Sequence, residues 1–130
     1  MLKFAYTIFY VQDVVKTIGF YEKAFGLKKA FIADTGEFGQ LDTGSTALAF
    51  ANISLITEEV PGGFIAGDIN KQPLGVEVAF ATDDVAQAYD AAVAAGAVAV
   101  APPAAKPWGQ TVAYVKDING FLVEICTPLG

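Results

Sequence analysis

Two glutamates stand alone on otherwise apolar faces of two predicted strands. Side chains alternate between the two faces of a strand, so Glu124, in the run 121–126, has two apolar neighbours on its own face. Glu77, in the run 75–81, shares its face with glycine and alanine only. Two carboxylates in a cavity could bind a cationic ligand or act as an acid–base pair. The same pattern is also typical of solvated glutamates on the water-facing side of an antiparallel sheet, and alternation alone leaves both interpretations open.

The composition limits the chemistry that can accompany these carboxylates. The chain has no histidine, which excludes Ser-His-Asp and Cys-His triads and removes the commonest transition-metal ligand. Its single cysteine, Cys126, cannot form an intramolecular disulfide, so nothing indicates an oxidising compartment. A bound metal would therefore depend on oxygen ligands and at most one thiolate.

The charge balance excludes some partners. Eight basic and fourteen acidic residues give a net charge of −6, which argues against a nucleic acid or an anionic membrane surface as partner. Basic residues near the two glutamates are few, which disfavours a phosphate-bearing ligand. No apolar stretch reaches the length of a membrane span and no signal-peptide pattern is evident, so we expect a soluble, cytoplasmic protein. With 54% hydrophobic residues, it should bury surface against a partner subunit or enclose a cavity.

A strand followed by a helix is predicted twice along the chain. The run 4–11 is aromatic and β-branched, as is typical of a strand, and Asp13 follows as a helix N-cap candidate. Apolar residues at helical spacing then lead to Gly26, where a C-terminal glycine is expected. The same pattern returns with the strand 74–82 and the cap candidate Asp84. This indicates an internal duplication.

Three further short strands are predicted after each helix. They are 29–34, 38–42 and 47–55 in the first half, and 97–101, 110–116 and 121–127 in the second. The turn Asp117–Gly120 is a hairpin signal because Asn-Gly tolerates positive φ. We therefore predict an α+β fold, a single domain over 1–130 built of two βαβββ repeats. The repeats span about 1–55 and 74–130 and are joined by a linker, 56–73.

The order of these elements and several short motifs resemble one family. The most specific motif is the turn Asp117-Ile118-Asn119-Gly120, which leads into the strand Val123-Glu124-Ile125. The others are Tyr10-Val11-Gln12-Asp13-Val14, Phe20-Tyr21, Phe25-Gly26-Leu27 and Pro107-Trp108-Gly109-Gln110. Over essentially its whole length the chain resembles the vicinal oxygen chelate superfamily, which includes glyoxalase I, bleomycin-resistance proteins, fosfomycin-resistance enzymes and extradiol dioxygenases. The resemblance implies paired βαβββ modules that form a cup-shaped mixed sheet around a ligand pocket, and a homodimer.

The resemblance also points to four positions where metal-dependent members carry ligands, commonly His or Gln, Glu, His and Glu. In this chain these positions are Tyr6, Ala49, Glu77 and Glu124, of which only Glu124 keeps its usual identity. Alanine cannot bind a metal and neutral tyrosine is a poor ligand. Two carboxylates make a weak transition-metal site, so no metal cofactor is favoured. A divalent metal such as Mg²⁺ or Mn²⁺, held by Glu77, Glu124 and water, is the alternative.

Without a metal, the two glutamates must be paired, hydrated or partly protonated, and they would suit a cationic or amine-bearing ligand. Aromatic side chains could supply the rest of the wall, and Trp108 could stack on a planar or cationic ligand. For Trp108 a place in the core or in a dimer interface is equally typical, whereas each of the other aromatic candidates is more typical of plain core. The predicted ligand-contact residues are Tyr6, Tyr10, Ala49, Phe50, Glu77, Trp108, Tyr114 and Glu124.

The sequence thus favours a metal-free homodimer that binds a small organic ligand. The closest functional resemblance is to bleomycin-resistance-type proteins, which sequester aromatic, cationic compounds without converting them. The alternative is a glyoxalase-like lyase or isomerase, or a dioxygenase-related enzyme, in which Glu77 and Glu124 are the catalytic candidates around a divalent ion or as acid and base. A third interpretation is an interaction module whose pocket is vestigial.

Overall fold

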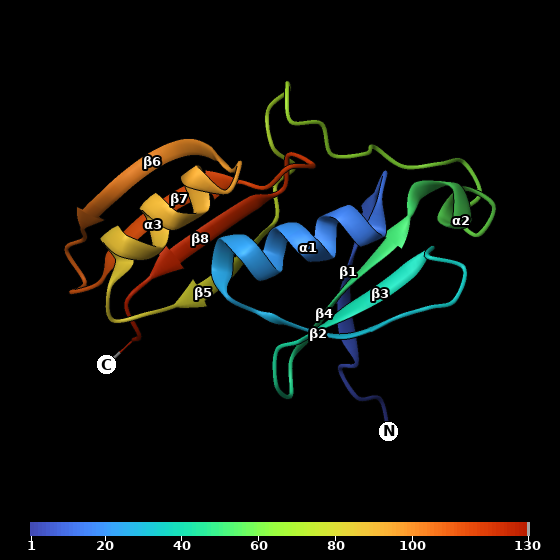
Figure 1. The fold of residues 1–130 in the computed structure, drawn as a ribbon, viewed down its shortest axis with the longest axis horizontal. Coiled ribbons are helices and arrows are strands. Elements are labelled where there is room, and N and C mark those ends of the chain that lie inside the picture. The colour runs from blue at the N-terminus through green and yellow to red at the C-terminus, as the bar shows by residue number, and fades with distance from the viewer. Residues whose placement is uncertain (130) are drawn as a thin grey trace. The chain divides into compact units, whose positions relative to one another are not determined.

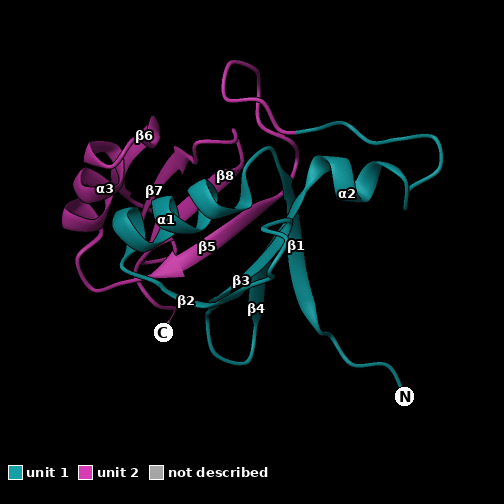
Figure 2. Ribbon diagram, turned by 45° about the vertical axis from the view of Figure 1, so that its right-hand side comes forward, with its two compact units in different colours: residues 1–66 teal, residues 67–130 magenta. Residues whose placement is uncertain are grey.

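The chain forms two compact units, residues 1–66 and residues 67–130 (Figure 2). They are seen in a computed structural model that describes residues 1–129. Each unit contains a four-stranded mixed sheet with a helix packed on one face (Figure 1). The element order confirms the predicted α+β class and the two βαβββ modules. No helix in the described part of the chain is long and apolar enough to cross a membrane.

The first unit has the strand order β1-β4-β3-β2. Strand β1 runs parallel to β4, and the other neighbouring strands are antiparallel. Its elements are β1 (Tyr6–Val11), α1 (Val14–Phe25), β2 (Lys28–Ile32), β3 (Phe38–Asp42), β4 (Ala47–Asn52) and the short helix α2 (Ile53–Thr57).

Helix α1 begins and ends at the two predicted capping residues. The carboxylate of Asp13 accepts a hydrogen bond from the backbone N–H of Lys16 at 2.9 Å, which satisfies one of the free donors of the first turn. Gly26 takes a left-handed φ of 68° and donates its N–H to the carbonyl of Glu22. The helix packs on the sheet through Tyr21, whose buried ring lies 5.0 Å from that of Phe50.

The second unit repeats this arrangement with the strand order β5-β8-β7-β6, and β5 runs parallel to β8. Asp84 caps its helix by accepting from the backbone N–H of Gln87 at 3.1 Å, as predicted. Alternate side chains of β7 and β8, among them Val115 and Val123, are fully buried. The elements are β5 (Glu77–Ala81), α3 (Val85–Ala94), β6 (Val98–Ala105), β7 (Thr111–Lys116) and β8 (Leu122–Cys126).

The parallel strand pair of each module, β1 with β4 and β5 with β8, has the same register. In the first unit Tyr6 pairs with Ala47, and in the second Glu77 pairs with Leu122, each at the start of its strand. Two residues further along β4 and β8, the equivalent positions hold Ala49 and Glu124. The structural repeat therefore follows the equivalence that the sequence repeat predicts.

Strand β4 is shorter than predicted because a polar side chain ends it. The predicted strand extends to residue 55, but Asn52 accepts hydrogen bonds from the backbone N–H and hydroxyl of Ser54, at 2.9 and 2.7 Å. Its amide also donates to the carbonyl of Gln12 at 3.0 Å. Asn52 thus caps α2, a helix that the apolar pattern did not predict.

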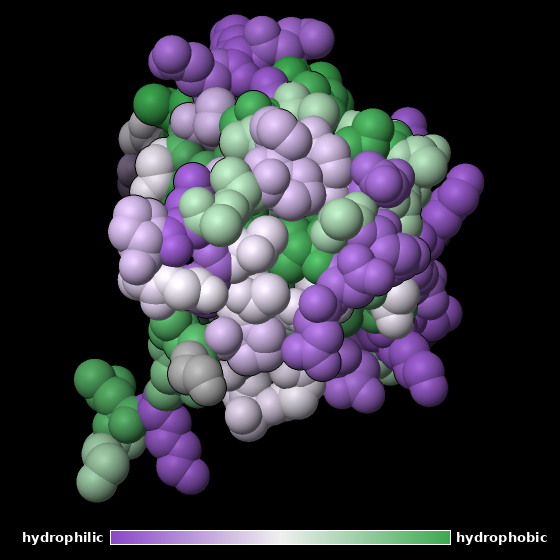
Figure 3. Space-filling model, turned by 90° about the vertical axis from the view of Figure 1, so that its left-hand side faces the viewer, coloured by the Kyte–Doolittle hydropathy of each residue, from purple (hydrophilic) through white to green (hydrophobic). Residues whose placement is uncertain are grey.

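Strand β6 is longer than predicted and includes Pro102 and Pro103. It lies at the end of the strand order, and an edge strand tolerates prolines because its outer side needs no ladder hydrogen bonds. The middle of the molecular face on the side of β6 and α3 mixes pale purple, white and green in the space-filling view, and much of the saturated purple lies toward its edges (Figure 3). This agrees with the stretch 91–105, which contains no charged residue.

The turn between β7 and β8 is held by a buried carboxylate. Asp117 is fully buried, and its Oδ1 accepts from the backbone N–H groups of Asn119 and Phe121 at 2.8 and 2.9 Å. Within the turn only Gly120 takes a positive φ, of 88°, whereas Asn119 remains at a negative φ. The hairpin is confirmed, but the positive φ expected of an Asn-Gly pair is confined to the glycine.

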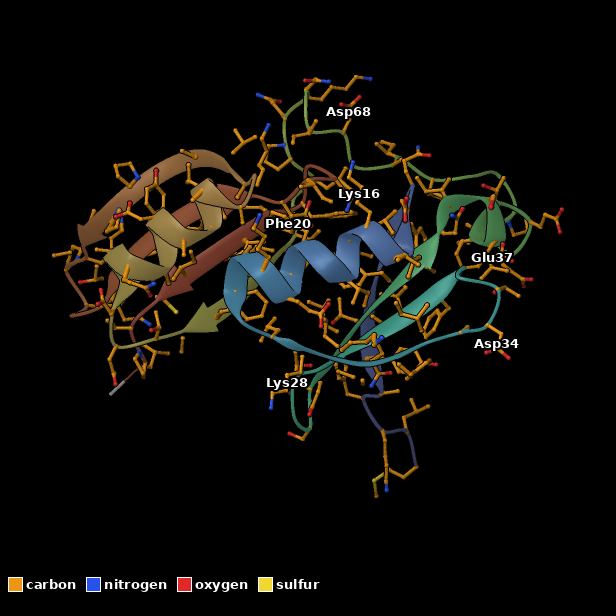
Figure 4. The ribbon with its side chains drawn as sticks, in the orientation of Figure 1. Lys16, Phe20, Lys28, Asp34, Glu37 and Asp68 are labelled. Atoms are coloured by element: carbon orange, nitrogen blue, oxygen red, sulfur yellow. The ribbon has the colours of Figure 1, made fainter. Side chains whose placement is uncertain are left out.

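We predict that Gly120→Ala lowers the free energy of unfolding by about 2 kcal/mol or more, measured by denaturant unfolding. A Cβ at this position would lie 2.5 Å from the backbone carbon and oxygen of Asp68, in addition to the strain of a positive φ. Figure 4 labels Asp68, on the loop that opens the second unit.

Gly109→Ala is the matched control. Gly109 also has a positive φ, 99°, but a methyl group added there would meet no other part of the described chain within 4 Å. This variant should cost only the backbone strain. Equal losses for the two variants would contradict the role given to the close approach between Gly120 and Asp68.

Candidate functional site

Four titratable side chains of the second unit lie together on the sheet face opposite α3. Strand register places Glu124 on β8 directly opposite Tyr114 on β7, and beside Ala79 on β5. Glu77 begins β5 on the same face, and Cys126 follows Glu124 two residues along β8. We call Glu77, Tyr114, Glu124 and Cys126 the acidic group.

The acidic group is centred on Glu124. The hydroxyl of Tyr114 donates to Oε1 of Glu124 at 3.1 Å. The negative charge of Glu124 also acts on Glu77 and Cys126. Glu77 is exposed, Tyr114 and Glu124 are half-buried, and Cys126 is buried. Glu124 therefore lies on the central strand of the group, between β5 and β7.

The surroundings raise the pKa of three members of the group. The pKa of Glu77 lies above its ordinary value of 4.5, first through partial burial and then through the neighbouring side chain of Glu124 and its negative charge. Burial, followed by the influence of Glu124, likewise raises the pKa of the Tyr114 hydroxyl and that of the Cys126 thiol. The environment thus favours the protonated, neutral forms of the side chains around Glu124.

Lys116, a basic residue on the same face of β7, has its ammonium engaged elsewhere. Lys116, two residues from Tyr114 on β7, donates from Nζ to the carbonyl oxygens of Ile69 and Lys71 at 2.8 and 3.2 Å. It thereby holds the loop after residue 67 against the β7–β8 hairpin. The acidic group is consequently suited to attract a cation, whereas a phosphate would meet two carboxyl groups.

The donor set of the acidic group does not fit a transition metal. Within residues 1–129, no three His, Cys, Asp or Glu side chains are grouped as a metal site would require. Oε1 of Glu124 already accepts from the Tyr114 hydroxyl. Burial raises the pKa of the Cys126 thiol and so disfavours a thiolate ligand, and the chain has no histidine to supply imidazole. We therefore derive no chemistry that passes through a metal at this position.

Trp108, also in the second unit, lies in the turn before β7 and is 64% exposed. Its Nε1 donates to Oε1 of Gln110 at 2.7 Å, and Nε2 of Gln110 donates to the carbonyl of Thr127 at 2.7 Å. The indole is thus exposed but anchored to the end of β8. Its described hydrogen bond joins it to Gln110 and not to the acidic group.

The other predicted ligand contacts belong to the first unit. Tyr6 is 50% exposed on β1, and Tyr10 meets Phe64 edge to face with ring centroids 4.8 Å apart. Ala49 is fully buried, and Phe50, its neighbour, lies on the opposite face of β4, in the core against Tyr21. The structure therefore places Phe50 under α1, away from the sheet face that carries Tyr6, Tyr10 and Ala49.

Some charged residues of the first unit lie outside that face, because Asp34 and Glu37 belong to the loop between β2 and β3 and Lys16 projects from α1 (Figure 4). Lys28, which begins β2, pairs with Asp42 at one end of the face. The face opposite α1 instead carries a second aromatic pair, Phe31 and Phe38, with ring centroids 6.0 Å apart. The two modules thus differ in chemistry, one face being aromatic and the other acidic.

Sequence reasoning missed the contact of Tyr114 with Glu124 and the roles of Gln110 and Lys116. A signal for the first was available, because counting outward from the turn 117–120 sets Tyr114 opposite Glu124. The hydrogen bonds of Gln110 and Lys116 reach residues far along the chain, and no local pattern indicates them.

Comparisons with known proteins agree with this architecture. A family model described as the glyoxalase/bleomycin resistance protein/dioxygenase superfamily matches residues 3–125. Comparison with curated proteins returned no match.

Several solved structures have a similar fold. A glyoxalase-related enzyme from Fulvimarina pelagi is 24% identical, with a TM-score of 0.81 over 98% of this chain and 89% of that chain. A glyoxalase/bleomycin resistance protein/dioxygenase family enzyme from Burkholderia phytofirmans PsJN is 20% identical, with a TM-score of 0.81 over 97% and 98%. TioX from Micromonospora sp. ML1 is 24% identical, with a TM-score of 0.69 over 97% and 98%. At these identities the likeness shows the fold alone.

The raised pKa of Glu77 predicts a pH-dependent stability. A carboxyl whose pKa is higher in the folded state stabilises the fold below its unfolded pKa, and this stabilisation is lost as the pH rises through the folded value. Glu77→Gln should therefore be more stable than the parent protein at pH 7, by up to about 1 kcal/mol for so exposed a group. The advantage should shrink as the pH falls toward 4.5, the ordinary value. Denaturant unfolding at several pH values measures it.

Glu22→Gln, at an exposed position of α1, controls for the removal of a glutamate elsewhere in the chain. If both variants show the same pH profile relative to the parent protein, the effect does not come from the acidic group.

Proposed function

The chain belongs to the glyoxalase/bleomycin resistance protein/dioxygenase superfamily, and on this basis we propose that it binds a small organic ligand without a metal. In this proposal Glu77 and Glu124 bind the cationic group of an aromatic or amine-bearing compound. The protein would sequester that compound without converting it.

One observation carries the proposal: Glu77 and Glu124 lie on the same sheet face, opposite α3, on the neighbouring parallel strands β5 and β8. Two acids brought together repel each other when both are ionised. A cation placed between them would relieve this repulsion and form charge-assisted hydrogen bonds to both. Lys116 supports a cationic ligand as well, because its ammonium is already bound to two carbonyl oxygens and does not neutralise the two acids.

The first test compares two probe ligands that differ in charge. Benzamidine is a planar aromatic cation, and benzamide is its neutral counterpart. We predict that benzamidine binds to the protein, that benzamide binds at least tenfold more weakly, and that Glu124→Gln and Glu77→Gln each weaken benzamidine binding about tenfold. Isothermal titration calorimetry measures the affinities, with Glu22→Gln as the control variant. Equal binding of the two probes would contradict a cation site.

The fate of the ligand distinguishes sequestration from catalysis. The single tryptophan, Trp108, serves as a fluorescence reporter for larger ligands such as bleomycin, and mass spectrometry should recover the bound compound unchanged. A converted compound would favour the enzyme alternative. A stoichiometric divalent ion that is lost in Glu124→Gln would overturn the metal-free proposal.

A further inference from the structure

The ammonium of Lys116 is held by two backbone carbonyl oxygens of the same unit. Its Nζ donates to the carbonyls of Ile69 and Lys71 at 2.8 and 3.2 Å. A carbonyl oxygen accepts hydrogen bonds from a cation but carries no charge to neutralise it. The loop 67–76, which supplies both carbonyls and leads into β5, therefore decides where this positive charge lies.

Strand register places Lys116 in the same row of side chains as Glu77. Lys116 pairs with Leu122 across β7 and β8, and Leu122 pairs with Glu77 across β8 and β5. Neighbouring strands lie about 4.8 Å apart, which puts the Cα atoms of Lys116 and Glu77 about 10 Å apart on one sheet face. The long side chains of a lysine and a glutamate that lean toward each other can bridge this gap. Glu77 is thus a second acceptor within reach of the ammonium.

Close backbone contacts hold the loop 67–76 on the turn between β7 and β8. A Cβ at Gly67 would lie 2.8 Å from the carbonyl oxygen of Asn119, and one at Gly120 would lie 2.5 Å from backbone atoms of Asp68. Only glycine allows two backbones to approach so closely. The N–H of Lys71 donates to the carbonyl of Asp68 at 3.0 Å, which helps to shape the loop that meets the ammonium.

The seated loop keeps the ammonium away from Glu77. Glu77 is exposed, and an exposed ion pair is weak because water screens it and two long side chains must be ordered. Hydrogen bonds from a charged donor to carbonyls that the fold already positions are favoured over such a pair. When the loop leaves the turn these carbonyls are lost, and Glu77 offers the ammonium both an acceptor and a negative charge.

We propose that Lys116 is a specificity-determining residue of the cation site and that the loop 67–76 controls it. With the loop seated, the ammonium is held away and the two glutamates accept a cationic ligand. With the loop lifted, the ammonium of Lys116 pairs with Glu77 and takes the place of the ligand. The ligand part of the inference rests on the proposed function, whereas the placement of the ammonium does not.

Ligand binding and seating of the loop then favour each other. A cation bound to Glu77 excludes the ammonium of Lys116, which returns to the carbonyls of Ile69 and Lys71. Because the coupling between two sites is reciprocal, the ligand favours the seated loop by the same factor by which the seated loop raises the affinity for the ligand.

Zero-length crosslinking of the free protein tests where the ammonium lies. A carbodiimide joins an amine to a carboxyl group that is in contact with it, and mass spectrometry identifies the joined peptides. We expect a crosslink between Lys116 and Glu77 to form at least about fivefold more in Gly67→Ala than in the parent protein. The added methyl group pushes the loop away from the turn. Gly75→Ala is the matched control and should behave like the parent protein, because a Cβ there meets nothing in the described chain within 4 Å.

The crosslink can overturn the proposal in two ways. Equal yields in the parent protein and in Gly67→Ala would show that the loop does not control the ammonium. Absence of the crosslink from both proteins would show that Lys116 does not reach Glu77. If Gly67→Ala does not fold, Asp68→Ala takes its place under the same criteria. This second variant removes the carboxylate that accepts from the backbone N–H of Asn70 at 2.9 Å, and it loosens the loop without adding bulk.

The ligand part is tested by a double-mutant cycle, with calorimetric titration of benzamidine. Gly67→Ala should weaken benzamidine binding about fivefold to tenfold when Lys116 is present, and by less than about twofold when it is combined with Lys116→Met. A purely structural role of the loop would weaken binding equally in both backgrounds, and this result would overturn the inference while the proposed function stands. No binding to the parent protein, together with the expected crosslinks, would refute the proposed function and support the placement of the ammonium.

Discussion

The acidic group depends on one turn. The buried carboxylate of Asp117 accepts two backbone hydrogen bonds within the turn, and Gly120 takes the positive φ that closes it against the backbone of Asp68. This geometry fixes the register of β7 against β8, and with it the pairing of Tyr114 with Glu124. A slip of one residue would turn Glu124 toward the buried side of the sheet, because neighbouring residues of a strand point to opposite faces. The turn that stabilises the hairpin therefore also sets the strand pairing on which the acidic group depends.

The two modules show how a single fold carries different chemistry. Equivalent positions hold Tyr6 and Ala49 in the first unit, and Glu77 and Glu124 in the second. The substitutions leave the register of the strands unchanged, because side chains on this face do not contribute to the helix-covered core. One module therefore presents aromatic and small residues while the other presents two acids. Two ionised acids on one sheet face repel each other, and a cation bound between them would relieve this repulsion.

Local signals explain which elements the sequence predicts well. The capping residues Asp13 and Asp84, and the turn at Asp117, act within a few residues of themselves, so their patterns can be read directly from the chain. Helix α2 was not predicted, because the apolar run 47–55 continues past its N-cap, Asn52, and indicated one longer strand.

Positions within the sheets are harder to predict, because they depend on which strands meet. Phe50 was grouped with Ala49 although adjacent residues of a strand face opposite sides, and the structure places Phe50 in the core. The pairing of Tyr114 with Glu124 follows from the hairpin register alone, whereas their hydrogen bond also needs the side chains of the folded sheet. The contacts of Gln110 and Lys116 bring together segments far apart in the chain, which no local pattern reveals.

The candidate site depends on the carboxyl groups of Glu77 and Glu124, which lie on one sheet face, binding a cation together. Carbon-13 NMR of labelled glutamate carboxyls tests this most directly, because it follows each carboxyl group while a ligand is added. We expect benzamidine to shift the signals of Glu77 and Glu124 and to leave that of Glu22 unchanged, whereas benzamide should shift none of them. Signals of Glu77 and Glu124 that do not respond to benzamidine, or that move no more than that of Glu22, would contradict a cation site formed by these two residues.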